Sequence, residues 1–232
     1  MLVQNLSVFF PAFNEAENIA QTTEKAIKVL KNLRLKKWEI LIIDDGSKDS
    51  TGKIADELAK KYPQIRVIHQ PNGGYGAALR TGFYQSKYDW IVYTDSDGQF
   101  DFSEVNKFID KTSEADLILG YRIKRNDPRI RLLLAKGWKF LIFLFFATWF
   151  QDVDCGFKMV SKKVLSTIPR LESSRGAMIN PELALNAQKM GFKIVQVGVH
   201  HYPRLYGTPT GSSLKVIINS FLDLFKLWLK LT

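Results

Sequence analysis

Short apolar runs alternate with amphipathic stretches through the first half of this 232-residue chain. The apolar runs are rich in Val, Ile, Leu and aromatic residues and are too short for buried helices, so they predict strands at residues 6–11, 38–44, 65–69, 89–94 and 116–120. Helices are expected between them, at residues 15–33, 50–61, 75–87 and 103–113, with Asn14, Ser50 and Ser103 as N-caps. This alternation predicts an α/β fold with a mostly parallel sheet and helices on both faces.

The second half of the chain departs from this rhythm. An apolar, aromatic-rich run covers residues 132–150, and the pattern beyond it predicts a helix around 181–190, a strand at 193–199 and a final helix near 213–231. The chain shows no internal repeat, low-complexity tract or long linker. One domain with an appendage is therefore preferred over two domains.

The final segment has the pattern of an amphipathic helix. Its polar residues recur every three or four positions and so share one helical face, whereas the remainder is almost entirely Leu, Ile, Phe and Trp. The polar residues are Lys215, Asn219, Asp223, Lys226 and Lys230. A spanning helix needs about 20 predominantly apolar residues, so this segment and the shorter run at 140–150 are expected to lie in a membrane interface. The alternative is that both pack on the domain as ordinary amphipathic helices.

Composition and charge narrow the choice of partner. A hydrophobic fraction of 46% with 16 Phe allows a sizeable core, and a formal charge of +10 suits nucleic acid, an anionic membrane or phosphorylated substrates. Basic residues at 122–131 lead directly into the apolar run, as at a membrane interface, and no nucleic-acid-binding module is recognisable, so nucleic acid is not an expected partner. The single cysteine, Cys155, and a start without a signal-peptide pattern place the folded body in the cytoplasm.

Acidic and amide side chains follow three of the predicted strands. Asn14-Glu15, Asp44-Asp45 and Asp95-Ser96-Asp97 each come just past a strand end. In sheets of this kind ligands bind beyond the carboxyl ends of the strands, so these motifs are expected to converge on one crevice.

Asp95 and Asp97 have the spacing of a pair that could hold one hard divalent cation together with diphosphate oxygens, and Gln99 adds a third oxygen at the next alternate position. Mg²⁺ or Mn²⁺ there would act as a Lewis acid on a departing diphosphate. An acidic pair in a loop is, taken alone, more often a solvated turn.

Two further motifs suit a nucleotide. Asp44 and Asp45 could accept hydrogen bonds from a base or a ribose, although they could equally form a turn and a helix cap. The glycines of residues 73–76 allow close approach of the backbone to a ligand, but this segment matches neither the Walker loop nor G-x-G-x-x-G.

Five motifs in order carry a resemblance to a known family. They are Phe10-Pro11-Ala12-Phe13-Asn14-Glu15, Ile43-Asp44-Asp45-Gly46-Ser47, Gly76-Ala77-Ala78-Leu79-Arg80-Thr81-Gly82, Asp95-Ser96-Asp97-Gly98-Gln99 and Asp154-Cys155-Gly156-Phe157-Lys158. Together they resemble the signatures of family 2 glycosyltransferases, specifically the dolichol-phosphate mannosyltransferase-like branch, over nearly all of residues 5–215. The ordered set is far more specific than any single motif.

The resemblance implies a GT-A (Rossmann-like) fold and an inverting transfer from a nucleotide-sugar. It places the nucleotide-sugar near Pro11, Phe13, Asn14, Glu15, Asp44, Asp45, Gly76, Asp95 and Ser96, and the metal at Asp95, Asp97 and Gln99. The residues expected to take part in catalysis are Asp97, Arg122, Arg131 and Arg204, because the arginines match family residues that meet the acceptor phosphate or the donor diphosphate. A guanidinium can bind two phosphate oxygens at once. Phe13 stands where Tyr is common in the family.

Chemistry favours a phosphate acceptor. A phosphate monoester with a second pKa near ~6 is largely dianionic at neutral pH and can attack the anomeric carbon without a general base. A hydroxyl acceptor would need one, and Asp152 or Asp154 could serve. His69, His200 and His201 show no convincing metal-ligand spacing.

The expected function is transfer of a hexose, from GDP-mannose or a UDP-sugar such as UDP-glucose, to a dolichyl or undecaprenyl phosphate at the cytoplasmic face of the membrane. The expected parts are a nucleotide-sugar-binding half (1–130), an interfacial region (131–151), an acceptor-binding half (152–212) and a C-terminal membrane-interface helix (213–232). The alternatives are a family 2 transferase acting on a saccharide or protein hydroxyl and a non-catalytic, membrane-peripheral nucleotide-sugar-binding protein. The sequence does not determine the oligomeric state.

Overall fold

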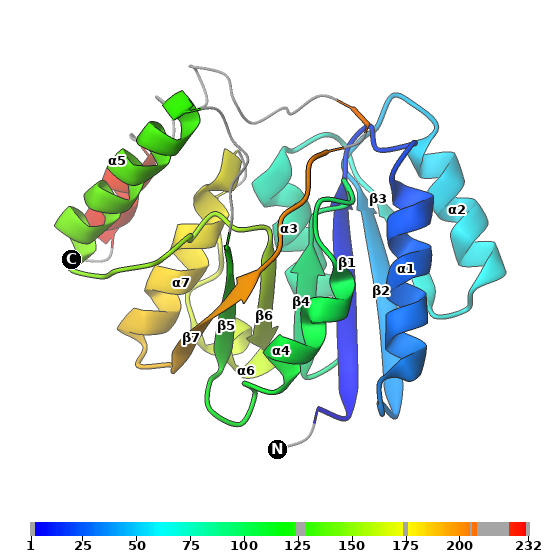
Figure 1. The fold of residues 1–232 in the computed structure, drawn as a ribbon, viewed down its shortest axis with the longest axis horizontal. Coiled ribbons are helices and arrows are strands. Elements are labelled where there is room, and N and C mark those ends of the chain that lie inside the picture. Colours follow the sequence, from blue (N-terminus) through cyan, green and yellow to red (C-terminus); the bar gives the residue numbers. More distant parts are fainter. Residues whose placement is uncertain (1–2, 124–128, 174–175, 205, 208–222, 231–232) are drawn as a thin grey trace.

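The computed structural model describes the chain except for residues 1–2, 124–128, 174–175, 205, 208–222 and 231–232 (Figure 1). The strands are β1 (Asn5–Ala12), β2 (Lys37–Asp44), β3 (Ile65–His69), β4 (Trp90–Thr94), β5 (Leu117–Arg122), β6 (Phe157–Ser161) and β7 (Ile194–Val199). The α-helices are α1 (Ile19–Asn32), α2 (Thr51–Lys61), α3 (Tyr75–Gln85), α4 (Val105–Ile109), α5 (Arg129–Phe146), α6 (Lys162–Thr167) and α7 (Ile179–Lys189), and residues 223–230 are also helical. Two 3-10 turns, η1 (Phe102–Glu104) and η2 (Gly176–Met178), precede α4 and α7.

The strands form one seven-stranded sheet in the order β3-β2-β1-β4-β6-β5-β7. Every neighbouring pair is parallel except the two pairs that contain β6, which runs antiparallel to β4 and β5. The predicted mostly parallel sheet is confirmed, and all the strands predicted in the first half exist. Sequence analysis missed β6, which enters the sheet between β4 and β5.

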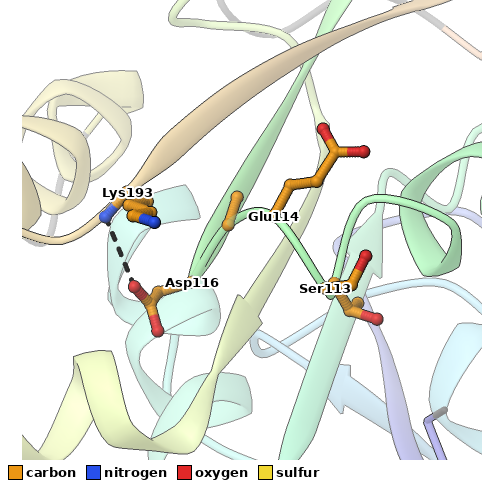
Figure 2. A pocket seen from close by; sticks show the side chains of 6 residues that line it. Ser113, Glu114, Asp116 and Lys193 are labelled. Carbon is orange, nitrogen blue, oxygen red and sulfur yellow. Dashed lines mark hydrogen bonds between the residues drawn. The ribbon is translucent and has the colours of Figure 1, made fainter. Parts of the chain in front are cut away.

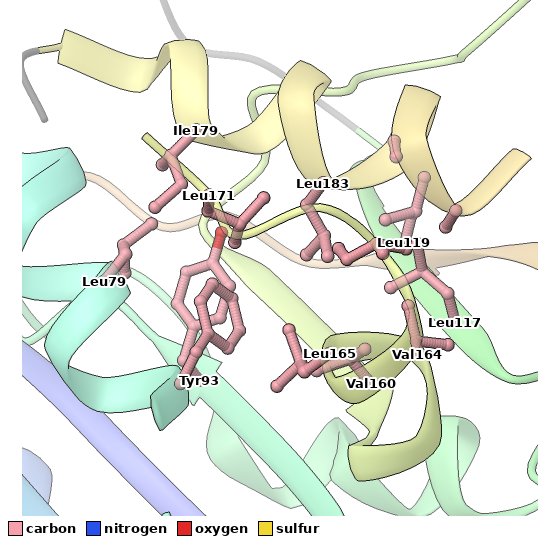
Figure 3. Packing of buried hydrophobic residues seen from close by; sticks show 14 of the residues in the cluster. Leu79, Tyr93, Leu117, Leu119, Val160, Val164, Leu165, Leu171, Ile179 and Leu183 are labelled. Atoms are coloured by element: carbon pink, nitrogen blue, oxygen red, sulfur yellow. The ribbon is translucent and has the colours of Figure 1, made fainter. Parts of the chain in front are cut away.

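Helices cover both faces of the sheet, as predicted. Residues of α1, α2 and α4 share one buried apolar cluster with one face, and residues of α3, α6 and α7 share a second cluster with the other. Figure 1 shows α1 and α4 in front of the sheet and α3 behind it. In Figure 3, Leu79 of α3, Leu165 of α6 and Leu183 of α7 surround Tyr93 and Leu119 of the sheet, so three helices are joined to it by one core.

Gly82 marks the place where α3 comes closest to β1. A Cβ there would lie 2.3 Å from the ring of buried Phe9, so Gly82→Ala is expected to lower the free energy of unfolding by about 1–3 kcal/mol through overpacking. Gly137 of α5 is the matched control, because a Cβ there meets no atom within 4 Å and alanine favours the helix by up to ~1 kcal/mol. Urea unfolding of the two variants measures both effects, and a Gly82→Ala protein as stable as the wild type would contradict this packing.

The predicted helix starts were correct in part. Asn14 is not an N-cap: it has φ 56°, and α1 begins at Ile19, after a turn in which Asn18 N–H donates to the Glu15 carbonyl at 3.0 Å. Ser103 is not the cap of its helix either, because Asp101 accepts its N–H at 2.9 Å and the α-helix that follows ends already at Ile109. Ser50 does precede α2, although its side chain makes no capping hydrogen bond.

The apolar run at 132–150 forms most of α5, which lies beside the helix at 223–230 (Figure 1). Phe145 of α5 contacts Phe225 and Trp228, with ring centroids 6.4 and 5.6 Å apart, and Leu224 and Leu227 are buried in the same cluster as α7. None of the helices in the described part of the chain has both the length and the apolar character needed to cross a bilayer.

The amino ends and the carboxyl ends of the parallel strands differ in character. At the amino ends of β5 and β7 a small pocket of about 250 Å³ is lined by residues 112–116 and Lys193, where the Lys193 N–H donates to Asp116 at 3.3 Å (Figure 2). None of the motifs singled out in the sequence reaches it. They lie at the opposite edge, where the parallel strands end, so that edge is the candidate site.

Candidate active site

The loops that follow β1, β2 and β4 meet at the carboxyl edge of the sheet. The Ser96 hydroxyl donates to the Pro11 carbonyl at 2.7 Å, which joins the end of β4 to the end of β1. Asn14 joins β1 to β2, because its N–H donates to Ser47 Oγ at 3.0 Å and its side-chain oxygen accepts the Lys48 N–H at 2.8 Å. The structure therefore brings the three polar motifs together. The hydrogen bonds of Asn14 and Ser96 connect the loops of the site to one another.

Asp44 and Asp45 are both buried and have different partners. Asp44 accepts the Ser47 N–H at 3.0 Å and lies 2.9 Å from His69 Nδ1. Burial alone would raise the pKa of Asp44, but the hydrogen bonds from Ser47 and His69 outweigh it and hold that pKa below its usual value. These contacts fix the turn after β2, and a role for Asp44 at the nucleotide stays a prediction.

Asp45 holds the glycine loop in place. Its carboxylate accepts the N–H groups of Gly73 and Gly74 at 3.0 and 2.8 Å, and the Gln70 amide at 2.6 Å. Gly74 has φ 88° and is the N-cap residue of α3, in which Gly76 is buried. Asp45 thus sets the position of the α3 N-terminus, while a direct contact of Asp45, Gly76 or half-buried Phe13 with the nucleotide stays a prediction.

Asp95 is the carboxylate that begins the acidic turn. It follows β4 directly, its N–H donates to the Gly156 carbonyl at 3.2 Å, and it accepts the Tyr75 hydroxyl at 2.8 Å. Burial raises the pKa of Asp95 to about 7, and the neighbouring Asp97 carboxylate adds to that shift. Sequence reasoning missed Tyr75 as a partner, because a glycine-rich turn gives no sign of where its one hydroxyl points.

Asp97 and Gln99 complete the acidic turn. Asp97 accepts the Gln99 N–H at 3.0 Å, and burial raises the pKa of Asp97. The Gln99 amide nitrogen donates to the Tyr202 carbonyl at 2.9 Å, so the amide oxygen is the atom of that side chain left to serve a cation. This bond, together with Tyr202 N–H to the Gln99 carbonyl at 2.8 Å, holds the segment after β7 against the acidic turn.

Arg204 reaches into the acidic site from that segment. Its guanidinium pairs with Glu15 and lies 3.5 Å from Asp97 Oδ2, and its Nε donates to the Tyr206 carbonyl at 2.6 Å. Burial raises the pKa of Glu15, against the lowering effect of Asn18 and Arg204. The predicted arginine is therefore at the site, and its ion pairs are with the carboxylates of Glu15 and Asp97.

Residues 7–168 match the family model described as Glycosyl transferase family 2. The chain belongs to this family. It is 29% identical to the dolichyl-phosphate beta-glucosyltransferase ALG5A of Trichomonas vaginalis, over 96% of this chain and 72% of that protein. It is 29% identical to the dolichyl-phosphate beta-glucosyltransferase of Saccharomyces cerevisiae, over 93% of this chain and 70% of that one.

A solved glycosyltransferase has the same fold. Glucosyl-3-phosphoglycerate synthase from Mycobacterium tuberculosis, in complex with Mn²⁺, uridine diphosphate and phosphoglyceric acid, superposes with a TM-score of 0.75 at 18% identity, over 97% of this chain and 78% of that one. The expected GT-A fold is confirmed by this likeness and by the sheet topology.

The acidic turn of this family 2 glycosyltransferase suits a divalent cation. Asp95 and Asp97 are two desolvated carboxylates, each with a raised pKa, and Mg²⁺ and Mn²⁺ prefer such oxygen ligands. Within the described residues, no group of three or more His, Cys, Asp and Glu side chains is arranged to hold a metal ion. Asp95, Asp97 and the Gln99 oxygen are therefore suited to a cation whose coordination a substrate diphosphate completes.

The other two predicted arginines have different outcomes. Arg122 of this glycosyltransferase forms a two-pronged ion pair with Asp152, with Nε to Oδ2 at 2.6 Å and Nη2 to Oδ1 at 2.9 Å. The pair is nearly buried, so a phosphate would have to share or displace Asp152 to bind this guanidinium. The partnership was not predicted, and it also occupies Asp152, one of the two candidate general bases. The side chain of Arg131 lies outside the described part of the structure.

Proposed function

We propose that this enzyme transfers a hexose from a nucleotide-sugar to a polyprenyl phosphate, with inversion at the anomeric carbon. The observation that carries the proposal is the half-buried acidic turn after β4, Asp95 to Gln99, in a chain similar over most of its length to dolichyl-phosphate beta-glucosyltransferases. The cytoplasmic face of a membrane and the division into parts at residues 130, 151 and 212 belong to this proposal.

The donor we propose is UDP-glucose, ahead of GDP-mannose. The names of the relatives favour glucose, and solved neighbours of the same fold hold uridine diphosphate with Mn²⁺ or Mg²⁺. The base itself would sit between the loops after β1 and β2, where Asn14, Asp44 and Asp45 fix the backbone.

The side chains of the site divide the work of an inverting transfer. The residues that would hold Mg²⁺ or Mn²⁺ are Asp95, Asp97 and Gln99. The cation would neutralise the negative charge that develops on the departing diphosphate. Arg204, already placed between Glu15 and Asp97, offers a second positive group to the phosphates of donor or acceptor. A dianionic phosphate acceptor needs no general base, which agrees with the engagement of Asp152 by Arg122.

The outer surface of α5 and of the helix at 223–230 supports a membrane-held acceptor. Both helices pack inward on the core through residues such as Ile142 and Leu227, as the alternative of ordinary amphipathic packing requires. Their outer surfaces nevertheless expose large apolar side chains, with Leu144 63% and Leu229 59% exposed. The full outer set is Phe140, Phe143, Leu144, Phe225 and Leu229. Several large exposed apolar groups on helices that carry lysines are typical of a membrane-interface surface.

The decisive experiment presents the purified chain with UDP-glucose and dolichyl phosphate in vesicles, with Mn²⁺ or with a chelator. The expected product is a glucolipid that forms only with the metal ion, with GDP-mannose in place of UDP-glucose as the matched donor control. Preferential glucosylation of soluble glycans would favour the hydroxyl-acceptor alternative. Binding of UDP-glucose without any transfer would favour the non-catalytic one.

The proposed membrane surface makes its own prediction. Because burying each large apolar side chain contributes about 1.5–3 kcal/mol, the double substitution Leu144→Glu/Leu229→Glu is expected to weaken binding to anionic vesicles by at least about 100-fold. Both side chains are exposed, so the melting temperature should stay near that of the wild type. Met190→Glu, at an exposed site following α7, is the control. Equal flotation of all three proteins with the vesicles would contradict a membrane role for this surface.

A further inference from the structure

Lys158 of β6 is a fully buried lysine next to the acidic site. Its exposed fraction is 0%, and its ammonium group donates to the Cys155 carbonyl and to the Tyr93 hydroxyl, the latter at 3.3 Å. The same ammonium lies 5.6 Å from the centroid of the Tyr93 ring. Lysines are almost never fully buried unless they are paired, because removing the charge from water is costly. This one needs a reason.

The hydrogen bond from Lys158 to the Cys155 carbonyl holds the turn that packs against Asp95. The turn is closed by the Cys155 N–H, which donates to the Asp152 carbonyl at 3.1 Å. Its last residue, Gly156, accepts the Asp95 N–H at 3.2 Å, and a Cβ at Gly156 would lie only 2.0 Å from an Asp95 carboxylate oxygen. The ammonium on the Cys155 carbonyl therefore holds the backbone that bounds one side of the Asp95 carboxylate.

The second contact of Lys158 is with Tyr93, a residue of β4, the strand that leads directly into Asp95. Tyr93 donates its hydroxyl to Asn180, and the Asp95 carboxylate separately accepts the Tyr75 hydroxyl at 2.8 Å. Lys158 thus contacts two segments that adjoin Asp95, the Cys155–Gly156 turn and strand β4.

We propose that Lys158 is a positioning residue, which holds Asp95 in the orientation for divalent-cation binding through the Cys155–Gly156 turn and through Tyr93 of β4. The inference rests on the proposed metal-dependent function and extends it to a residue outside the cation's own ligands. Groups that orient metal ligands from behind typically contribute about 10–100-fold to metal affinity.

Two simpler roles for Lys158 make different predictions. If Lys158 were only a positive charge near the site, its removal would strengthen cation binding, because one repulsive charge would be gone. If it were only a packed core residue, its removal would act like any other core truncation on β6. Only a positioning role predicts that removing Lys158 weakens cation binding more than truncating another core residue of β6 does.

The test measures binding of Mn²⁺ alone to the full chain, from the electron paramagnetic resonance signal of free Mn²⁺. Lys158→Met is expected to bind Mn²⁺ about 10–100-fold more weakly than the wild type. Val160→Ala is the matched control: it truncates a fully buried side chain two residues along the same strand, on the same face, and is expected to keep wild-type affinity despite a lower melting temperature. Tyr93→Phe, which removes only the hydroxyl that Lys158 contacts, decides the question if Lys158→Met does not fold.

Each outcome of this test is decisive. Weaker binding in Lys158→Met or Tyr93→Phe with normal binding in Val160→Ala supports the proposal. Unchanged or tighter binding in the first two overturns it and leaves the metal site standing. A wild-type chain that binds no Mn²⁺ overturns the metal site itself, and the positioning role with it.

Discussion

Replacing Asp97 with asparagine is expected to lower the kcat of sugar transfer by about 10³-fold, because neutralising charge on the departing diphosphate is worth several kcal/mol of transition-state stabilisation. Asparagine keeps the shape of the side chain and its hydrogen bond from the Gln99 N–H, but it removes the negative charge that a divalent cation requires. Chelation of the metal in the wild type is expected to reproduce the loss. Initial rates with UDP-glucose and dolichyl phosphate, over a range of Mn²⁺ concentrations, provide the measurement.

Asp110→Asn is the matched control for this change. Asp110 lies at the exposed end of α4, away from the site, and its replacement is expected to leave the rate unaffected. The melting temperature of Asp97→Asn separates chemistry from folding, since the ion pair it loses with Arg204 is long, at 3.5 Å. Normal transfer by a folded Asp97→Asn protein would refute the assignment of this turn to the cation.

Breaking the Arg122–Asp152 pair is expected to have the largest effect on stability. Asp152→Ala leaves the Arg122 guanidinium, with its side chain only 11% exposed, without its two-pronged partner. Removing one member of a buried ion pair typically costs about 3–5 kcal/mol, so a loss of that size is expected in urea unfolding. Glu24→Ala, which breaks the exposed pair with Lys61, is the control and should cost about 1 kcal/mol or less.

A double substitution separates the structural role of this pair from a role in phosphate binding. Arg122→Met/Asp152→Leu removes both charges of the pair, so most of the lost stability is expected to return. If the stable double variant still lacks transfer activity, Arg122 or Asp152 acts on substrate. If it transfers normally, the pair serves the fold alone. An Asp152→Ala protein as stable as the wild type would show that the pair contributes nothing to folding.

The parallel part of the fold could be predicted because each strand in it is a short apolar run between turn residues. β6 was not predicted because it is only five residues long and its sequence, Phe-Lys-Met-Val-Ser, contains a lysine. A charged residue normally argues against a strand that is buried on both faces. Only the tertiary contacts of Lys158, with Cys155 and Tyr93, make that residue acceptable there. The start of α1 was misjudged because Asn14, at φ 56°, bonds the loop after β2 and caps no helix.

The convergence of the acidic motifs could likewise be predicted, since carboxyl ends of parallel strands share one edge. The partners of each charge could not. Arg122 and Asp152 are 30 residues apart, and Arg204 lies 189 residues from Glu15, so no local pattern records either pair. The family resemblance implied that all three arginines meet phosphates, whereas the structure places Arg122 and Arg204 against carboxylates. To bind a substrate phosphate, each of these two arginines has to share or release the carboxylate that it contacts.

The position of β6 and β7 in the sheet has a consequence for synthesis on the ribosome. β1 to β4 can pair with one another as they emerge, but β5 has only β6 and β7 as neighbours, so its edges stay open until residues 157–199 have been made. Closing such long loops is slow, and an unpaired apolar strand is prone to aggregate meanwhile. The nascent chain is thus expected to depend on chaperones late in translation, and Asp95 gains its neighbour Gly156 only when β6 pairs with β4.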